Sequence, residues 1–141
     1  MKNIKVFFVI LAAAVGAVVI FNKNNTSSKQ TVLSPQTNSE GSVTVKATPR
    51  DISQNSTSWD FEIVLDTHSG NLDQDLVKTF ILVDDKGGQY IAISWEGDLP
   101  QGHHRQGILK FAPINPKPKS IELKINQIGE VGERSFNWEL K

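Results

Sequence analysis

The chain has 141 residues, enough for one domain of ordinary size and a short appendage. It contains no cysteine, which excludes disulfide bonds, thiolate metal sites, a cysteine nucleophile and a lipid-modified cysteine. The 15 basic and 15 acidic residues give a net charge of zero, and residues 42–141 hold 11 basic and 14 acidic residues, so the charge balance does not indicate nucleic-acid binding. We therefore expect no nucleic-acid partner.

An uninterrupted apolar run occupies residues 6–21 (VFFVILAAAVGAVVIF), between Lys5 and Lys23. A helix of this length would span roughly 24 Å of the ~30 Å hydrocarbon core, and the flanking lysines can snorkel across part of the difference. We predict that residues 1–21 form a signal-anchor, a single transmembrane helix in the cell membrane with the remainder of the chain on the extracytoplasmic side. The alternative is a cleaved signal peptide, for which residues 12–14 offer an A-x-A pattern in the middle of the run.

Asparagine, serine, threonine and glutamine dominate residues 22–41, where Val32-Leu33 is a short apolar pair. This composition is typical of a disordered linker. A linker of this length has a root-mean-square reach on the order of 25 Å. We therefore predict a boundary at residue 42, with a folded domain at residues 42–141 held just above the membrane surface.

From residue 42 onward, apolar and polar residues alternate with the period of two that is typical of β-strands. Seven such segments are separated by turn signals, at residues 42–48, 59–65, 79–84, 89–95, 108–112, 120–125 and 135–140. Only residues 72–78 show a short helical pattern. The economical arrangement is all-β, a seven-stranded antiparallel immunoglobulin-like β-sandwich.

Antiparallel strands reverse direction one after another, so their loops alternate between the two ends of the sandwich. The loops at residues 66–76, 96–107 and 127–133 therefore share one end, and those at residues 49–58, 84–88 and 113–118 share the other. All three histidines, His68, His103 and His104, fall at the first end. The first predicted strand also starts there, so we expect the linker to enter the domain at the histidine end.

Several short motifs occur together in this domain. They are Thr67-His68-Ser69, Leu72-Asp73-Gln74-Asp75-Leu76, Trp95-Glu96-Gly97, GHHRQGILKF at residues 102–111 and ERSFNWEL at residues 133–140. In this combination the chain resembles a family of small prokaryotic exported or membrane-anchored β-domains. The resemblance covers most of residues 43–141 and supports the domain boundary, and it implies neither a reaction nor a cofactor.

The histidine end offers ligands for a metal ion. Three imidazoles and one carboxylate suit Zn²⁺ or Cu²⁺, which makes His68, His103, His104 and Asp75 candidate ligands. Neighbouring histidines on a strand point to opposite faces, so the adjacent pair could converge on one ion only if the loop bends. Residues 71–75 also carry oxygen donors for Ca²⁺, although the EF-hand pattern is absent.

A polar network is the structural alternative at this end. Arg105 would pair with Asp73 or Asp75 and so close loop 66–76 against loop 96–107. Arg134 would pair in the same way with Glu96 or Glu133 at the third loop. Such arginine–carboxylate pairs are bidentate and directional, which suits the closing of loops.

We conclude from the sequence that the domain is a binding or interaction module whose loop end engages an envelope protein or glycan partner. The alternative is a Zn or Cu binding domain. A hydrolase using Ser69 beside His68 is a lesser alternative, because adjacent residues on an extended chain seldom aim at one another. The chain has no G-x-S-x-G elbow and no Gly-rich phosphate loop, so we do not expect an enzyme.

Overall fold

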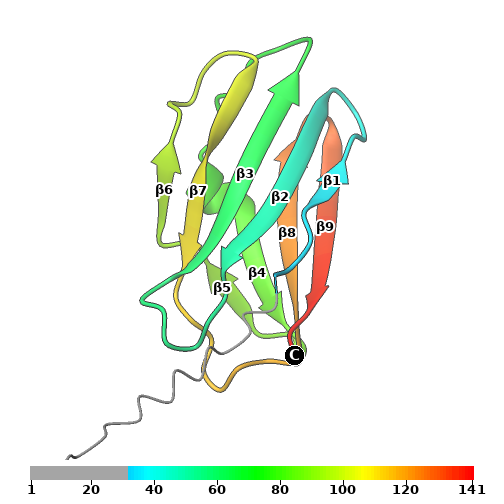
Figure 1. The fold of residues 1–141 in the computed structure, drawn as a ribbon. Helices are drawn as coiled ribbons and strands as arrows, with labels where there is room; N and C mark the ends of the chain where they lie inside the picture. The colour runs from blue at the N-terminus through cyan, green and yellow to red at the C-terminus, as the bar shows by residue number, and fades with distance from the viewer. Residues whose placement is uncertain (1–31) are drawn as a thin grey trace, which may run out of the picture.

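The computed structural model describes residues 32–141, which form two antiparallel sheets packed face to face (Figure 1). One sheet has the order β1-β2-β3-β7-β6, with the bounds β1 Gln36–Asn38, β2 Val43–Asp51, β3 Trp59–Thr67, β7 His104–Phe111 and β6 Ser94–Gly97. The other has the order β5-β4-β8-β9, with the bounds β5 Gln89–Ile91, β4 Phe80–Asp84, β8 Ser120–Ile128 and β9 Val131–Glu139. One short helix, α1 Leu76–Thr79, precedes β4 in the described chain. The predicted all-β sandwich of antiparallel sheets is confirmed, but the count of seven strands is wrong: the described residues form nine, because β1 is added and the segment at residues 89–95 is divided into β5 and β6.

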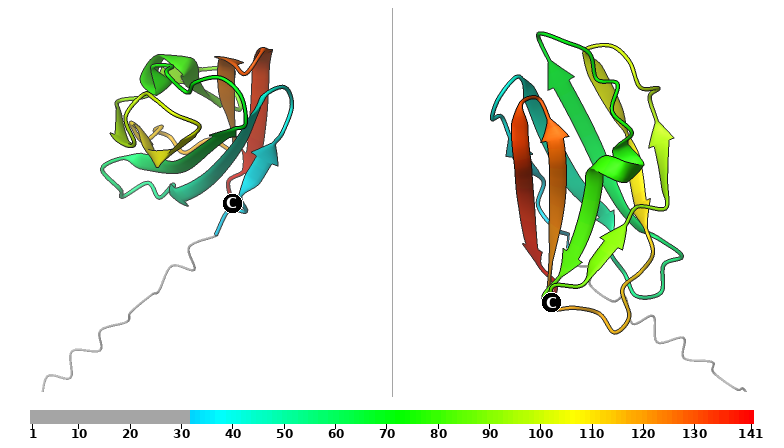
Figure 2. Two further views of the ribbon diagram at one scale, coloured as in Figure 1. Left: turned by 90° about the horizontal axis from the view of Figure 1, so that it is seen from above. Right: turned by 180° about the vertical axis from the view of Figure 1, so that it is seen from behind.

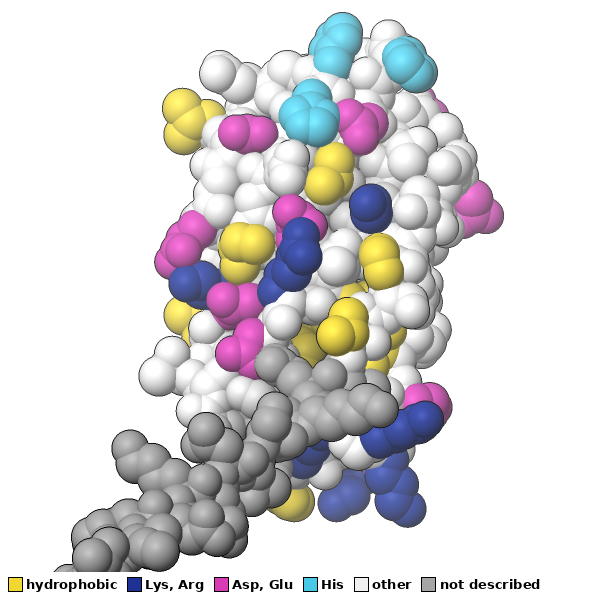
Figure 3. All heavy atoms as spheres, viewed as in Figure 1, with side chains coloured by type: hydrophobic (Ala, Val, Ile, Leu, Met, Phe, Trp, Pro, Cys, Tyr) yellow, Lys and Arg dark blue, Asp and Glu magenta, His cyan; other side chains and the backbone are white. Residues whose placement is uncertain are grey.

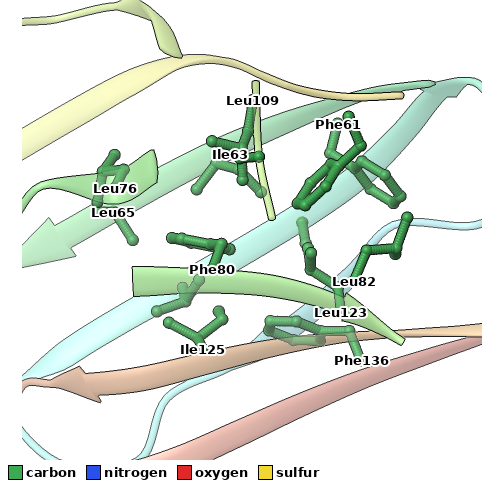
Figure 4. Close-up of a cluster of buried hydrophobic side chains, with 14 of the residues drawn as sticks. Phe61, Ile63, Leu65, Leu76, Phe80, Leu82, Leu109, Leu123, Ile125 and Phe136 are labelled. Atoms are coloured by element: carbon green, nitrogen blue, oxygen red, sulfur yellow. The ribbon is translucent and has the colours of Figure 1, made fainter. Parts of the chain in front are cut away.

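The inward side chains of the two sheets meet in one hydrophobic core (Figure 4). Along β3, every second residue from Trp59 to Leu65 is fully buried, as the period of two predicts. The Phe61 ring packs edge-on against Phe111 of its own sheet, with ring centroids 5.7 Å apart. It also lies 5.8 Å from Trp138 of the opposite sheet, so Phe61 joins the two layers. A slip of one residue would expose this whole row, and the pattern therefore fixes the register.

The predicted strand at residues 89–95 is two short strands in different sheets. β5 pairs with β4 and β6 pairs with β7, and the chain passes from one sheet to the other at residues 92–93. Both strands run in the same direction (Figure 2), so this crossing does not change the ends at which the later loops lie. Ala92 is buried between the exposed residues Ile91 and Ile93. A single continuous strand would give the same alternation, so the sequence pattern does not reveal the crossing.

The prediction of a disordered linker up to residue 41 is wrong for its last part. Gln36–Asn38 forms β1, which pairs antiparallel with β2. The Gln36 side chain accepts from the backbone N–H of Asn137 on β9 (3.2 Å) and donates to the carbonyl of the same residue (2.5 Å). The indole of Trp138 donates to the carbonyl of Ser34 at 2.8 Å. Polar side chains here bond to a sheet edge and not to water, which composition alone does not distinguish.

This extra strand changes the end at which the chain enters the domain. Because β1 and β2 are antiparallel, the chain reaches β1 from the end of the sandwich opposite the histidines (Figure 1). The expectation that the linker enters at the histidine end is therefore wrong. It assumes that β2 is the first strand of the domain.

No helix within residues 32–141 has the length and hydropathy needed to span a bilayer. The predicted transmembrane anchor at residues 1–21 lies outside the described residues, as does the first part of the predicted linker.

Candidate functional site

Four connections meet at one end of the sandwich, which we call the histidine pole: residues 39–42, 68–75, 98–103 and 129–130. His68 and His103 lie in these connections and His104 is the first residue of β7, so all three histidines gather at this end (Figure 3), which confirms the prediction from strand counting. Two backbone hydrogen bonds join the two longest loops. The N–H of Thr67 donates to the carbonyl of His103, and the N–H of Leu72 donates to the carbonyl of Gly102, both at 2.9 Å. His68 therefore directly follows a residue that is bonded to His103.

The guanidinium of Arg105 holds the loop between β3 and α1. The residue is 2 % exposed, and its Nη1 donates to the carbonyls of Leu72 (3.2 Å) and Gln74 (2.8 Å). Its Cζ lies 5.6 Å from the centre of the Trp95 ring, within the range of a cation–π interaction. Burial lowers the pKa of Arg105, and the nearby acids of the pole oppose this shift. The side chain thus fixes a loop from beneath.

Two facing glycines make room for the Trp95 ring. Gly97 and Gly107 are cross-strand partners on β6 and β7. A Cβ on either one would come within 2.4–2.6 Å of backbone atoms of the opposite strand and within 2.8–2.9 Å of the Trp95 ring. The indole N–H also donates to the carbonyl of Asp98 at 2.9 Å. The glycines of the W-E-G and H-H-R-Q-G motifs therefore have a packing role.

The guanidinium of Arg134 joins the β1–β2 turn to the β8–β9 turn. Arg134 is also 2 % exposed, and it donates to four acceptors. They are Asn38 Oδ1 (2.9 Å) and the carbonyls of Ile128 (2.6 Å), Glu40 (2.5 Å) and Val43 (3.0 Å). Burial lowers the pKa of Arg134, and the charge of Glu40 opposes this shift. One side chain therefore connects segments that are far apart in the sequence.

Both arginines close loops as the sequence predicts, but the predicted carboxylate partners are wrong. Glu96 instead pairs with Lys110 and Glu133 with Lys124, each at 3.0 Å. These pairs lie at the surface, where carboxylates keep their hydration. Backbone carbonyls can accept from a buried guanidinium without the desolvation of a second charge, which explains why they take the place of the acids. Arg134 donates from all three of its side-chain nitrogens, whereas Arg105 donates from Nη1 and its buried Nε has no partner among the described residues.

The two acids expected beside Arg105 face solvent. Asp73 is exposed. Asp75 is the N-cap of α1, where its side chain accepts from the N–H of Val77 and pairs with Lys78, both at 3.2 Å. The hydrogen bond from Lys78 lowers the pKa of Asp75. Asp75 thus serves the local helix and acts on Arg105 only through its field.

His104 pairs with a carboxylate across the sheet. Its Nδ1 lies 2.5 Å from Oδ1 of Asp66, its cross-strand partner on β3. The hydrogen bond to Asp66 raises the pKa of His104, and the charge of Asp98 adds to the shift. Both side chains of the pair are more than half exposed, at 55 % and 54 %. His68 and His103 are also exposed, so the pole presents all three imidazoles to solvent.

The predicted metal-ligand set is not brought together. Within residues 32–141, no group of three His, Cys, Asp or Glu side chains is placed to hold a metal ion. Asp75 caps α1 and His104 bonds to Asp66, while His68 and His103 project from loops. The geometry therefore does not support the predicted Zn or Cu site.

Comparisons of the chain with protein-family models, with curated proteins and with solved structures found no match. The function therefore has to be inferred from the geometry of the histidine pole.

Two supports of the pole are not predicted as site residues. Asn38 lies in a segment whose composition predicts a linker, and Trp95 stands out in the sequence only as part of the W-E-G motif. The apolar pair Val32-Leu33 is the signal for the first, because Leu33 packs against the core. The two glycines around Trp95 are the signal for the second.

Replacement of Arg134 by methionine should lower the free energy of unfolding by about 2 kcal/mol or more, because it leaves buried acceptors without donors. Urea denaturation of the full chain in detergent would measure this change. Lys124→Met is the matched control, since the Lys124–Glu133 pair lies at the surface, with side chains 29 % and 51 % exposed, and should contribute below about 1 kcal/mol. Equal losses in the two variants would contradict the role assigned to Arg134.

His104 should titrate with a midpoint above its ordinary pKa of about 6.5, and Asp66→Asn should lower that midpoint. The folded-state pKa is the higher one. The stability from this pair is therefore fully present below the unfolded pKa and is lost as the pH rises through the folded pKa. NMR titration of the imidazole would measure the midpoint, with His103→Gln as the control that should leave it unchanged. A midpoint at or below 6.5 in the unmodified protein would contradict the pairing.

Proposed function

We propose that this protein is a membrane-anchored, extracytoplasmic immunoglobulin-like domain that binds a partner through its histidine pole. The partner is an envelope protein or a glycan. Residues 66–76, 96–107 and 127–133, which comprise three loops of the pole and the adjoining strand ends, supply the contact residues. The N-terminal apolar run supports the anchor, because its length and lysine flanks suit a single-pass helix.

The strand order supports an immunoglobulin-like topology. β2-β3-β7-β6 corresponds to the A-B-E-D sheet of that fold, and β5-β4-β8-β9 corresponds to C′-C-F-G. In immunoglobulin variable domains, the B–C and F–G loops lie at the antigen-binding end. The corresponding loops here, residues 68–75 and 129–130, belong to the histidine pole.

The observation that carries the proposal is the location of the buried charges. Arg105 and Arg134 are the two buried charged residues within residues 32–141, and both lie beneath the histidine pole. Taking a guanidinium out of water is costly, and here it fixes loops whose outer side chains remain exposed. A surface that is ordered before binding loses less conformational entropy when a partner binds. These features are expected of a binding surface.

Site-specific photo-crosslinking of the full chain in its own cells would test this proposal. A photoreactive amino acid in place of His68 or His103 should give one defined crosslinked species, because these side chains project from the ordered pole. Asn55 is the matched control, since it is exposed in a loop at the opposite end of the sandwich. Crosslinking from Asn55 alone, or equally from all three positions, would contradict binding through the pole.

A further inference from the structure

The end of the sandwich opposite the histidine pole, which we call the base, carries a cluster of lysines (Figure 3). The base consists of residues 52–58, 85–88, 112–119 and 140–141. The side chains of these segments include four exposed lysines and a single acid, Asp85: the lysines are Lys86, Lys117, Lys119 and Lys141. Nζ of Lys117 donates to the carbonyl of Lys141 at 2.9 Å, so the last loop and the C-terminal residue lie together.

In the loop at residues 112–119, prolines alternate with lysines in a way that leaves the lysine side chains exposed. Residues 116–119 read P-K-P-K, and each proline ring fixes its own backbone φ. Pro118 is buried while Lys117 and Lys119 on either side are exposed. The loop is therefore pinned to the domain by its proline and presents its charges to the outside.

The histidine pole has the opposite charge. Its four connections contain five acids and neither lysine nor arginine: the acids are Glu40, Asp73, Asp75, Asp98 and Glu130. Strands of about nine residues separate the two ends by roughly 30 Å. The domain is thus polarised along its strands, acidic at the histidine pole and basic at the base.

The chain enters the domain at the basic end. Residues 32–35 precede β1, and the indole of Trp138, near the end of β9, fixes the Ser34 carbonyl beside the base. Ten residues separate the apolar run, which ends at Phe21, from Val32. Even fully extended, the eleven steps from Phe21 to Val32 reach no more than about 40 Å. Whatever surface holds the apolar run is therefore within that distance of the base.

We propose that the base docks on the anionic lipid headgroups of the membrane in which residues 6–21 are anchored, so that the histidine pole faces away from the bilayer. This inference rests on the anchor in the proposed function. Lysines near an anionic lipid surface are attracted to it over about one Debye length, and the acids of the histidine pole are repelled. The connection to the anchor keeps the effective lipid concentration high, so that weak attraction at the base is sufficient for docking. A membrane surface is favoured over a protein partner because the segment that leads to the anchor enters the domain at the same end as the lysines.

The full chain can be labelled at single sites, because it contains no native cysteine. Asn55→Cys marks the base and Ser69→Cys marks the histidine pole. Each labelled chain would be reconstituted into vesicles of phosphatidylcholine, alone or mixed with phosphatidylglycerol, that carry a headgroup acceptor dye. We expect energy transfer from the base label to exceed that from the pole label in the anionic vesicles, and to decrease in neutral vesicles or at high salt.

Charge variants test whether the base lysines cause this docking. Lys117→Glu with Lys119→Glu should reduce transfer from the base label to its level in neutral vesicles. Lys46→Glu with Lys78→Glu is the matched control, because it makes the same change in net charge at exposed sites away from the base. Circular dichroism would confirm that each double variant folds.

The outcomes separate this inference from the proposed function. Equal transfer from the two labels, or no dependence on anionic lipid, in chains that stay in the vesicles would overturn the docking alone. Release of the chain from vesicles by alkaline carbonate would overturn the anchor and the docking together. Loss of transfer in the control double variant to the same extent would also overturn the assignment to the base lysines.

Discussion

Hydrogen bonds from two buried guanidinium groups to backbone oxygens, and to the side-chain oxygen of Asn38, hold the histidine pole together. Arg134 donates to segments on both sides of the sandwich, from Asn38 to Ile128, and Arg105 fixes the carbonyls of Leu72 and Gln74. A buried charge is tolerated only where such bonds replace its hydration, so the arginines and the loop backbones require each other. The exposed histidines are carried on this support, which makes the pole one ordered surface and not a set of independent loops.

The three residues of β1 set the orientation of this surface. They add one reversal of the chain before β2, so that the N-terminal segment and the histidine pole lie at opposite ends. The side-chain oxygen of Asn38, the last residue of β1, also accepts a hydrogen bond from Arg134. β1 therefore determines the end at which the chain enters the domain, and through Asn38 it also bonds to Arg134, which orders the histidine pole at the other end.

The sequence predicts the sandwich and the grouping of the histidines, because both follow from the period of two and from the reversal of successive strands. The prediction survives the division of residues 89–95 into β5 and β6, since the crossing keeps the chain direction. The sequence does not reveal β1, because its composition is that of a linker. The hydrogen bonds of polar residues such as Gln36 are made to β9, which is distant in the sequence. The sequence also does not give the partners of Arg105. Loop positions show which acids lie near the arginine, but the cost of desolvating a carboxylate keeps those acids in solvent.

Native-state hydrogen exchange is the most direct test of whether the pole is ordered before a partner binds. The N–H groups of Thr67 and Leu72 donate to the opposite loop, and that of Gly102 donates to the Asn71 side chain at 2.6 Å. If the pole is ordered, these three amides should exchange about as slowly as the paired amides within β3. Exchange as fast as that of the amide of Asn55, an exposed residue in a loop of the base, would contradict a pre-ordered pole.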